Sequence, residues 1–169
     1  PGERYYGGCE YADEVEQLAI DRAQELYGAD HVNVQPHSGS QANMGVYLAV
    51  LDPGDKILSL DLTHGGHLSH GHPANFAGQM YEVEQYEVDA ETGRIDYDDL
   101  KEQAEEFDPD IVVSGYSAYP RTVEWEQIQD AADAADAYHL ADIAHITGLV
   151  AAGVHPSPVG VADFVTGST

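Results

Sequence analysis

The chain has 169 residues, of which 43% are hydrophobic; this suffices for one compact domain, or a piece of one, and is too short for two. Its 31 acidic and 6 basic residues give a net charge of −25, which excludes nucleic acid and anionic membranes as partners held by general electrostatics. Cys9 is the only cysteine, so neither a disulfide framework nor a thiolate metal cluster forms within the chain, and we expect a cytoplasmic protein.

The acidic residues are spread along the chain, and the apolar periodicity survives between them, which predicts a folded protein. An acidic surface with two lysines resembles that of halophilic proteins, in which salt screens the self-repulsion. No stretch approaches the roughly 20 apolar residues that cross a membrane, and the first residues have no signal-peptide character. We therefore expect no membrane association.

Apolar periodicity and turn residues predict an alternation of helices and strands. Helices are predicted over 13–27, 41–51, 96–106 and 125–137, strands over 31–35, 56–60, 80–88, 111–114, 138–142 and 163–166, and a turn or helix over 146–152. This order predicts an α/β fold with three layers, in which helices cover both faces of a mainly parallel sheet. We see no internal repeat and no linker, so residues 1–169 are expected to form part of one domain.

Asp142 and His145 follow a short apolar run that we interpret as a strand. Ligands bind at the carboxyl ends of the strands of open parallel sheets, so a carboxylate there is a candidate to meet one. A carboxylate can keep a pyridine nitrogen protonated, which keeps a cofactor ring electron-poor. The alternatives are that Asp142 caps the following turn and that His145 packs beside Leu140.

Ser38, Gly39 and Ser40 stand where the helix over 41–51 is predicted to begin. Backbone N–H groups at a helix N-terminus, with two hydroxyls and a glycine, favour a phosphate dianion. Ordinary turn and capping chemistry explains the same residues.

A glycine- and histidine-rich loop over 63–73 follows the strand over 56–60. Its histidines, which are His64, His67, His70 and His72, could bind a metal together with Asp61, since imidazole suits zinc. The spacing matches no helical histidine pair, however, and the loop has no thiolate. The competing interpretations are that one imidazole stacks on an aromatic cofactor ring, or that all four make only local hydrogen bonds.

Five segments together resemble the serine hydroxymethyltransferase family. They are Arg4–Glu10 (RYYGGCE), Gln35–Asn43 (QPHSGSQAN), His64–His67 (HGGH), Ser117–Tyr119 (SAY) and Asp142–His145 (DIAH), in the family's order and spacing. The resemblance implies the large domain of a type I pyridoxal 5′-phosphate (PLP) transferase. It also implies reversible transfer of a hydroxymethyl group from serine to tetrahydrofolate, which yields glycine, by a homodimer or a dimer of dimers.

The resemblance also implies roles for single residues, which are expectations by position. Ser38, Gly39 and Ser40 are expected to bind the cofactor phosphate, and His67 is expected to stack on the face of the cofactor ring. Asp142 is expected to bind the ring nitrogen, and Ser117 and His145 the ring oxygen. Tyr5 and Tyr6 are expected to reach the substrate, and Leu62, Gly66 and Leu68 to contact folate. Among these, His67, Asp142, His145 and Tyr6 are expected to take part in catalysis.

The departure from the family pattern that matters most concerns the lysine; the family's acidic pair before the Arg4–Glu10 segment and its substrate-binding arginine are also absent. A PLP enzyme needs a Schiff-base lysine, but Lys56 follows a turn and Lys101 lies on an acidic helix. The family's lysine would come just after Thr169, so the chain is expected to be an internal fragment that is inactive alone. Two alternatives remain open, namely a folate-independent PLP aldolase of the threonine aldolase type and a metal-binding module built on the histidine loop.

Overall fold

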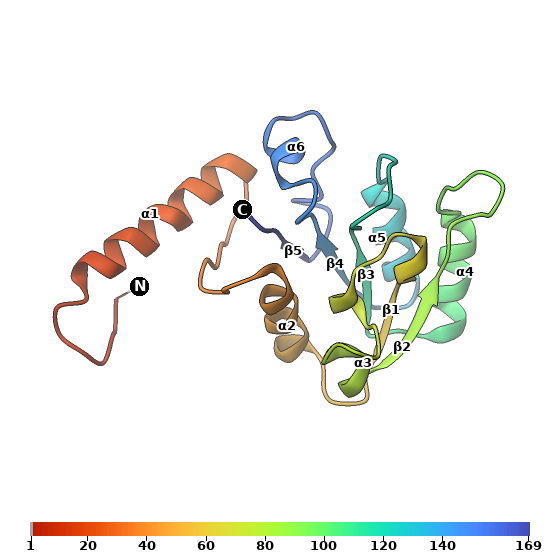
Figure 1. Cartoon of the computed structure of the whole chain (residues 1–169), viewed down its shortest axis with the longest axis horizontal. Helices are drawn as coiled ribbons and strands as arrows, with labels where there is room; N and C mark the ends of the chain where they lie inside the picture. The colour runs from red at the N-terminus through yellow and green to blue at the C-terminus, as the bar shows by residue number, and fades with distance from the viewer. Residues whose placement is uncertain (1) are drawn as a thin grey trace. The chain divides into compact units, whose positions relative to one another are not determined.

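A computed structural model of the chain describes residues 2–169, which fall into two compact units, one up to Pro36 and one from His37 (Figure 1). The first unit contains helix α1 (Glu10–Tyr27). Gly28 ends α1 in the left-handed conformation, at a φ of 68°, and its N–H donates to the carbonyl of Gln24. The predicted helix and its glycine stop are confirmed, with a start three residues earlier.

The strand predicted over 31–35 is wrong, because these residues form no strand. Their polar groups bond within the first unit instead: the Gln35 N–H donates to the Asn33 side chain, and the Gln35 amide donates to Glu16. Alternation over five residues is a weak signal when the side chains offer the backbone a local hydrogen bond.

The second unit is built on a sheet of five strands, all parallel, in the order β2-β1-β3-β4-β5. The strands are β1 (Lys56–Leu60), β2 (Glu82–Tyr86), β3 (Ile111–Ser114), β4 (Tyr138–Asp142) and β5 (Phe164–Thr166). The predicted parallel sheet is thus confirmed. β2 is shorter than the predicted 80–88, because Met80 ends a short helix and Val88 bridges to Ile95 outside the sheet.

Helices lie on both faces of this sheet, as predicted (Figure 1). They are α2 (Gly39–Val50), α3 (Ala77–Met80), α4 (Tyr97–Phe107), α5 (Trp125–Ala134) and α6 (Thr147–Ala151), with 3₁₀ turns η1 (Leu62–His64) and η2 (Leu68–His70). On one face Tyr47 of α2 packs with Ile57, Val113 and Leu140. Strand residues that alternate with these point to the opposite face of the sheet, toward α4 and α5. There the imidazole of His139 is hydrogen-bonded to Gln129 of α5.

Two glycines let the loops lie directly against the carboxyl edge of the sheet. A Cβ on Gly115 would lie 1.7 Å from the carbonyl oxygen of Asp142, and one on Gly66 would lie 2.1 Å from that of Leu60. Both contacts are far below van der Waals distance, so no other residue fits without moving the backbone. The loops after β1, β3 and β4 are thereby held together at one edge.

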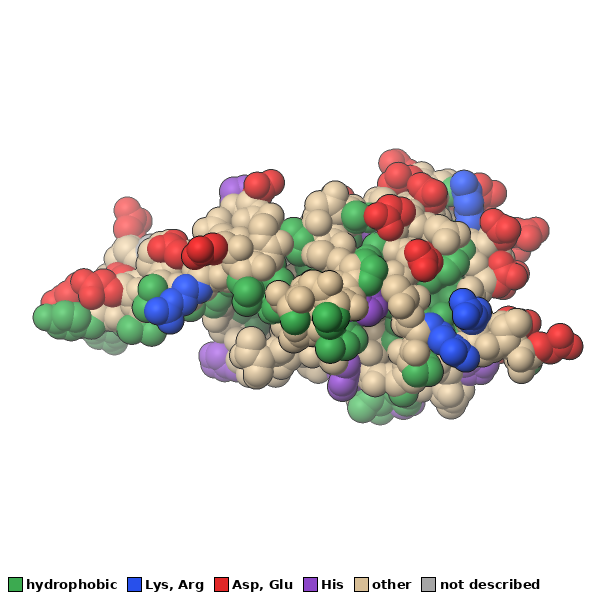
Figure 2. All heavy atoms as spheres, turned by 90° about the horizontal axis from the view of Figure 1, so that it is seen from above, with side chains coloured by type: hydrophobic (Ala, Val, Ile, Leu, Met, Phe, Trp, Pro, Cys, Tyr) green, Lys and Arg blue, Asp and Glu red, His purple; other side chains and the backbone are tan. Residues whose placement is uncertain are grey.

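Acidic side chains far outnumber basic ones over the face of the molecule in Figure 2, in keeping with the composition. Among residues 2–169, no helix has the length and apolar character needed to span a membrane.

Candidate active site

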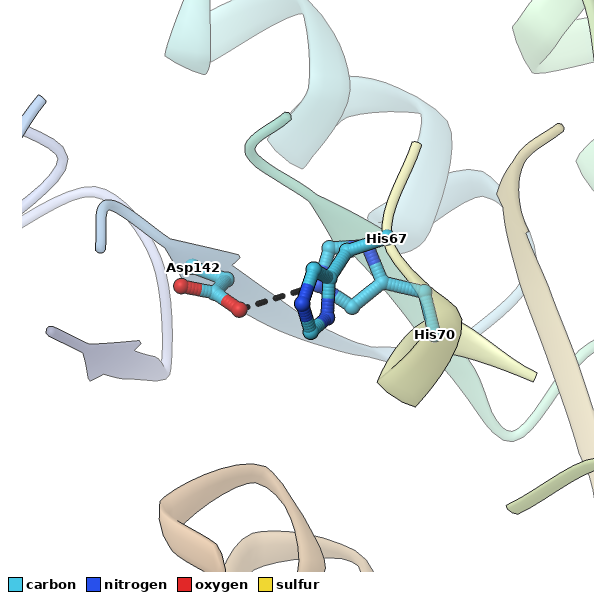
Figure 3. A group of neighbouring side chains, drawn as sticks. All are labelled: His67, His70 and Asp142. Carbon is cyan, nitrogen blue, oxygen red and sulfur yellow. Dashed lines mark hydrogen bonds and ion pairs between the residues drawn. The ribbon is translucent and has the colours of Figure 1, made fainter. Parts of the chain in front are cut away.

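Asp142 ends β4 at the carboxyl edge, and its side chain is 8% exposed. Its Oδ2 accepts a hydrogen bond from His70 Nε2 (3.0 Å; Figure 3). Oδ2 also accepts from Asn43 Nδ2 (2.8 Å), and Oδ1 accepts from the N–H of Ala144 (3.0 Å). Burial acts to raise the pKa of Asp142, but its electrostatic and hydrogen-bond interactions with His70, together with the hydrogen bonds from Asn43 and Ala144, outweigh burial and leave the pKa below its usual value. The carboxylate is therefore ionised at neutral pH.

His70 lies beneath this carboxylate and is 1% exposed. Its Nε2 is at hydrogen-bond distance from Asp142, whereas its Nδ1 is buried and has no partner among the described residues. A proton on Nδ1 would have no acceptor there, so the neutral form with the proton on Nε2 satisfies this site best. His70 thus donates to Asp142 through Nε2.

Asn43, on the second turn of α2, joins four elements through hydrogen bonds. Its Nδ2 donates to Asp142 and to Ser69 Oγ (2.9 Å), and its Oδ1 accepts from Thr166 Oγ1 (2.6 Å). Asn43 is fully buried, and Ser69 and Thr166 are buried as well. A buried amide satisfied at every atom holds α2, η2, β4 and β5 in one arrangement.

His67 precedes η2 and is partly buried. Its Nδ1 lies 2.7 Å from Ser69 Oγ and accepts from the Ser69 N–H (3.2 Å). Its ring centroid lies 5.5 Å from that of His70 and 6.3 Å from that of His145. Burial, followed by the proximity of His70, lowers the pKa of His67 despite the opposing charge of Asp142, so the imidazole is neutral at neutral pH.

The start of α2 lies beside the loop that follows Asp142. Ser38 caps the helix, because its Oγ accepts from the N–H of Gln41 (3.1 Å). A Cβ on Gly39 would lie 3.8 Å from Ser168 and 3.9 Å from Ala144, which is ordinary contact. The three predicted phosphate residues and the predicted carboxylate thus meet at one edge of the sheet.

The remaining predicted residues are divided between the loops of the second unit and the first unit. Ser117 has an exposed side chain, and its N–H donates to the carbonyl of Gly65 (2.9 Å), which joins the β3 loop to the β1 loop. The same β1 loop contains Leu62, Gly66 and Leu68, and His145 is exposed after β4. Tyr5 and Tyr6 belong to the first unit, where their exposed rings pack edge to face at 5.1 Å.

The sequence reasoning missed Asn43, Ser69 and Thr166, and it considered His70 only as one of the four loop histidines, without linking it to Asp142. One signal was available for Asn43. Asparagine is a poor helix former, and this one falls one turn before Tyr47 on the buried face of α2. A polar residue at such a position needs buried partners.

Hydrogen bonding disfavours the metal-binding alternative. His64 accepts from the N–H of Val88, and His72 accepts from that of Ala74, so these two are used locally. Potential ligand atoms of His67, His70 and Asp142 do lie within 4.8 Å of one another. A metal on Nε2 of His70 would, however, force the proton onto its buried Nδ1, which has no acceptor among residues 2–169, whereas metal-bound histidines normally donate from the other nitrogen.

The family model of serine hydroxymethyltransferase matches residues 1–169, which is the whole chain. The chain belongs to the serine hydroxymethyltransferase family. It is 87% identical to the serine hydroxymethyltransferase of Halorubrum lacusprofundi, 85% to that of Haloarcula marismortui and 81% to that of Halobacterium salinarum. Each match covers all of this chain and 41% of the relative, so the chain spans about two fifths of the length of these curated relatives.

These comparisons confirm the resemblance that the five segments indicate, and with it the α/β fold. The serine hydroxymethyltransferases named above come from halophilic archaea. The expectation of a halophilic protein, which rested on the excess of acidic residues, is confirmed as well.

Proposed function

We propose that the full-length protein containing this chain binds pyridoxal 5′-phosphate at the carboxyl edge of the sheet. It would reversibly transfer a hydroxymethyl group from serine to tetrahydrofolate, giving glycine and methylene-tetrahydrofolate. The observation that supports this most directly is the buried carboxylate of Asp142, whose pKa stays below its usual value because of the interactions with His70, Asn43 and Ala144. Membership in the family supplies the reaction.

The residues at this edge fit the cofactor in two respects. Oδ1 of Asp142 accepts a single hydrogen bond, from Ala144, so it retains a lone pair for a protonated ring nitrogen. The first backbone N–H groups of α2 lie beside the same loop, where the helix dipole favours a phosphate. When bound, PLP supplies an electron-poor ring that takes up the electron pair released from the substrate.

The chain's own side chains would bind and orient that group. Asp142 would hold the proton on the ring nitrogen, which a neutral partner could not do. His67 would cover one face of the ring and exclude water, and Ser117 and His145 would orient the ring oxygen. Ser38, Gly39 and Ser40 would bind the phosphate through their backbone N–H groups and hydroxyls.

The substrates would be recognised by the other predicted residues. Leu62, Gly66 and Leu68, in the loop after β1, would contact folate. Tyr5 and Tyr6 would reach the substrate across the interface of a homodimer, with Tyr6 taking part in catalysis. The enzyme would act in the cytoplasm, where a free thiol such as that of Cys9 stays reduced.

Neither lysine of this chain is placed to form the Schiff base. Lys56 begins β1, at the opposite edge of the sheet, and its Nζ donates to the carbonyl of Phe107 (2.8 Å). Lys101 is exposed on α4. We therefore propose that residues 1–169 alone have no turnover, and detectable activity of that piece would contradict this.

The test is an absorption spectrum of the full-length protein with PLP, recorded with glycine and then with glycine plus tetrahydrofolate. We expect a long-wavelength band that grows only when folate joins glycine, and that is lost in Asp142→Asn. The matched control is Asp130→Asn, an exposed carboxylate on α5. A cofactor band that does not change when folate is added would favour the alternative, a folate-independent PLP aldolase. The absence of any cofactor band would contradict the proposal.

A further inference from the structure

We propose that Asn43 and Ser69 are positioning residues that hold His67 as its neutral tautomer with the proton on Nε2. The inference rests on the proposed function only in placing His67 against the cofactor ring. The tautomer itself follows from the hydrogen bonds between these three side chains, each of which can be assigned a direction.

The assignment starts at Asn43, whose amide can be oriented in one way only. Its Oδ1 lies 2.6 Å from Thr166 Oγ1, which donates to it, and its Nδ2 lies 2.8 Å from the ionised Asp142, which can only accept. The second proton of Nδ2 therefore points to Ser69 Oγ at 2.9 Å. Ser69 is thus an acceptor toward Asn43.

The single hydroxyl proton of Ser69 is then free to donate, and His67 Nδ1 lies 2.7 Å away. The backbone N–H of Ser69 donates to the same nitrogen at 3.2 Å. Tyr47 fixes this backbone in turn, because its hydroxyl donates to the Ser69 carbonyl (3.1 Å). Since Nδ1 accepts, the ring proton is on Nε2.

A cationic His67 would conflict with this arrangement. Its Nδ1–H would meet the hydroxyl and the N–H of Ser69, and both of these buried donors would lose their acceptor. The titratable groups that face the ring are His70 on η2, Asp142 at the end of β4 and His145 in the loop beyond it. Only Asp142 favours the cation, and it already accepts hydrogen bonds from Asn43, His70 and the N–H of Ala144.

The fixed tautomer has two consequences for chemistry. A neutral imidazole can stack on a ring whose nitrogen is protonated, whereas an imidazolium would repel that charge and compete for Asp142. With Nδ1 occupied as an acceptor, the ring can donate a hydrogen bond only through Nε2–H. Ser69 and Asn43 would not touch the cofactor themselves.

The experiment is a long-range ¹H–¹⁵N spectrum of the full-length protein, with ¹⁵N-labelled histidine and no cofactor. We expect His67 to show an unprotonated, hydrogen-bonded Nδ1 and a protonated Nε2 at neutral pH. His139 provides an internal reference of the opposite kind, because its Nδ1 faces the amide oxygen of Gln129 (3.0 Å) and its Nε2 faces Ser114 Oγ (2.7 Å). Its unchanged signals would report that a variant is folded.

Ser69→Ala removes the hydroxyl donor, and Ser69→Thr keeps it. In the alanine variant we expect the Nδ1 signal to move toward that of a free lone pair, and protonation of His67 to become easier by about tenfold, as the loss of one hydrogen bond predicts. The threonine variant should match the wild type in both. A proton on Nδ1 in the wild type, or an alanine variant that changes neither quantity, would overturn the proposal, and neither result depends on whether PLP binds.

Discussion

Gly115→Ala should destabilise the protein strongly, because the added Cβ meets both a backbone clash and an unfavourable φ. Gly115 follows β3 with a φ of 88°, and an added Cβ would lie 1.7 Å from the carbonyl oxygen and 2.5 Å from the carbonyl carbon of Asp142. The obstructing atoms are backbone, so no side-chain rotation relieves the contact. Overpacking of this kind costs about 1–3 kcal/mol, and the left-handed φ costs alanine about 1–2 kcal/mol more, for a total of about 2–5 kcal/mol.

Two control variants separate these contributions. Gly93→Ala has a positive φ of 63° and nothing within 4 Å of the new Cβ, so it measures the cost of the conformation alone. Gly148→Ala, inside α6, has neither problem and should be neutral or slightly stabilising. Urea and thermal midpoints of the full-length protein should fall in the order Gly148→Ala, Gly93→Ala, Gly115→Ala. The reasoning is refuted if Gly115→Ala costs no more than Gly93→Ala.

Three further predictions concern pH, salt and metal. Burial lowers the pKa of His139 from 6.5 to about 4, so the unfolded state binds more protons between these values. Unfolding free energy should therefore drop by roughly 3 kcal/mol as pH falls from 7 to 4, and His139→Gln should flatten this part of the urea-midpoint profile. The melting temperature should rise as salt increases from millimolar to molar, because salt screens a net charge of −25; a fall would contradict this. Calorimetric titration of the cofactor-free protein with zinc should show no tight binding at Asp142, because zinc on His70 Nε2 would leave the Nδ1 proton without an acceptor among the described residues. Tight zinc binding that is lost in Asp142→Asn would contradict this.

The sheet could be predicted because its strands are marked by local patterns. Residues 111–114 and 138–142 are short apolar runs between helical segments, and both became buried central strands. The same reasoning located Asp142, since a polar residue at the end of such a run reaches the edge of the sheet. It failed at 31–35, where alternation was the only signal and the Asn33 and Gln35 side chains make hydrogen bonds within the first unit instead.

The network around Asp142 could not be predicted from local patterns. Asn43 bonds to Ser69, 26 residues away, to Asp142, 99 residues away, and to Thr166, 123 residues away. Each partner is an ordinary polar residue whose role depends on which helix the fold places beside which strand end. Gly115 is similar, because only the position of the Asp142 carbonyl shows why a side chain is excluded there.

The hydrogen bonds that Asp142 accepts bear on how a chain with so many acidic residues responds to salt. The donors are the Asn43 amide, the Ala144 N–H and the His70 imidazole, and they keep the pKa of the buried carboxyl below its usual value, so that the group is ionised at neutral pH. Molar salt screens charges at the surface, but it acts far less on a pair buried from water. A protein of net charge −25 can therefore depend on salt for its stability, while the proposed pairing of a protonated ring with Asp142 would be affected far less. This requires that Asn43 and His70 hold the carboxylate away from water, and that Gly115 lets the β3 loop pack against the Asp142 backbone.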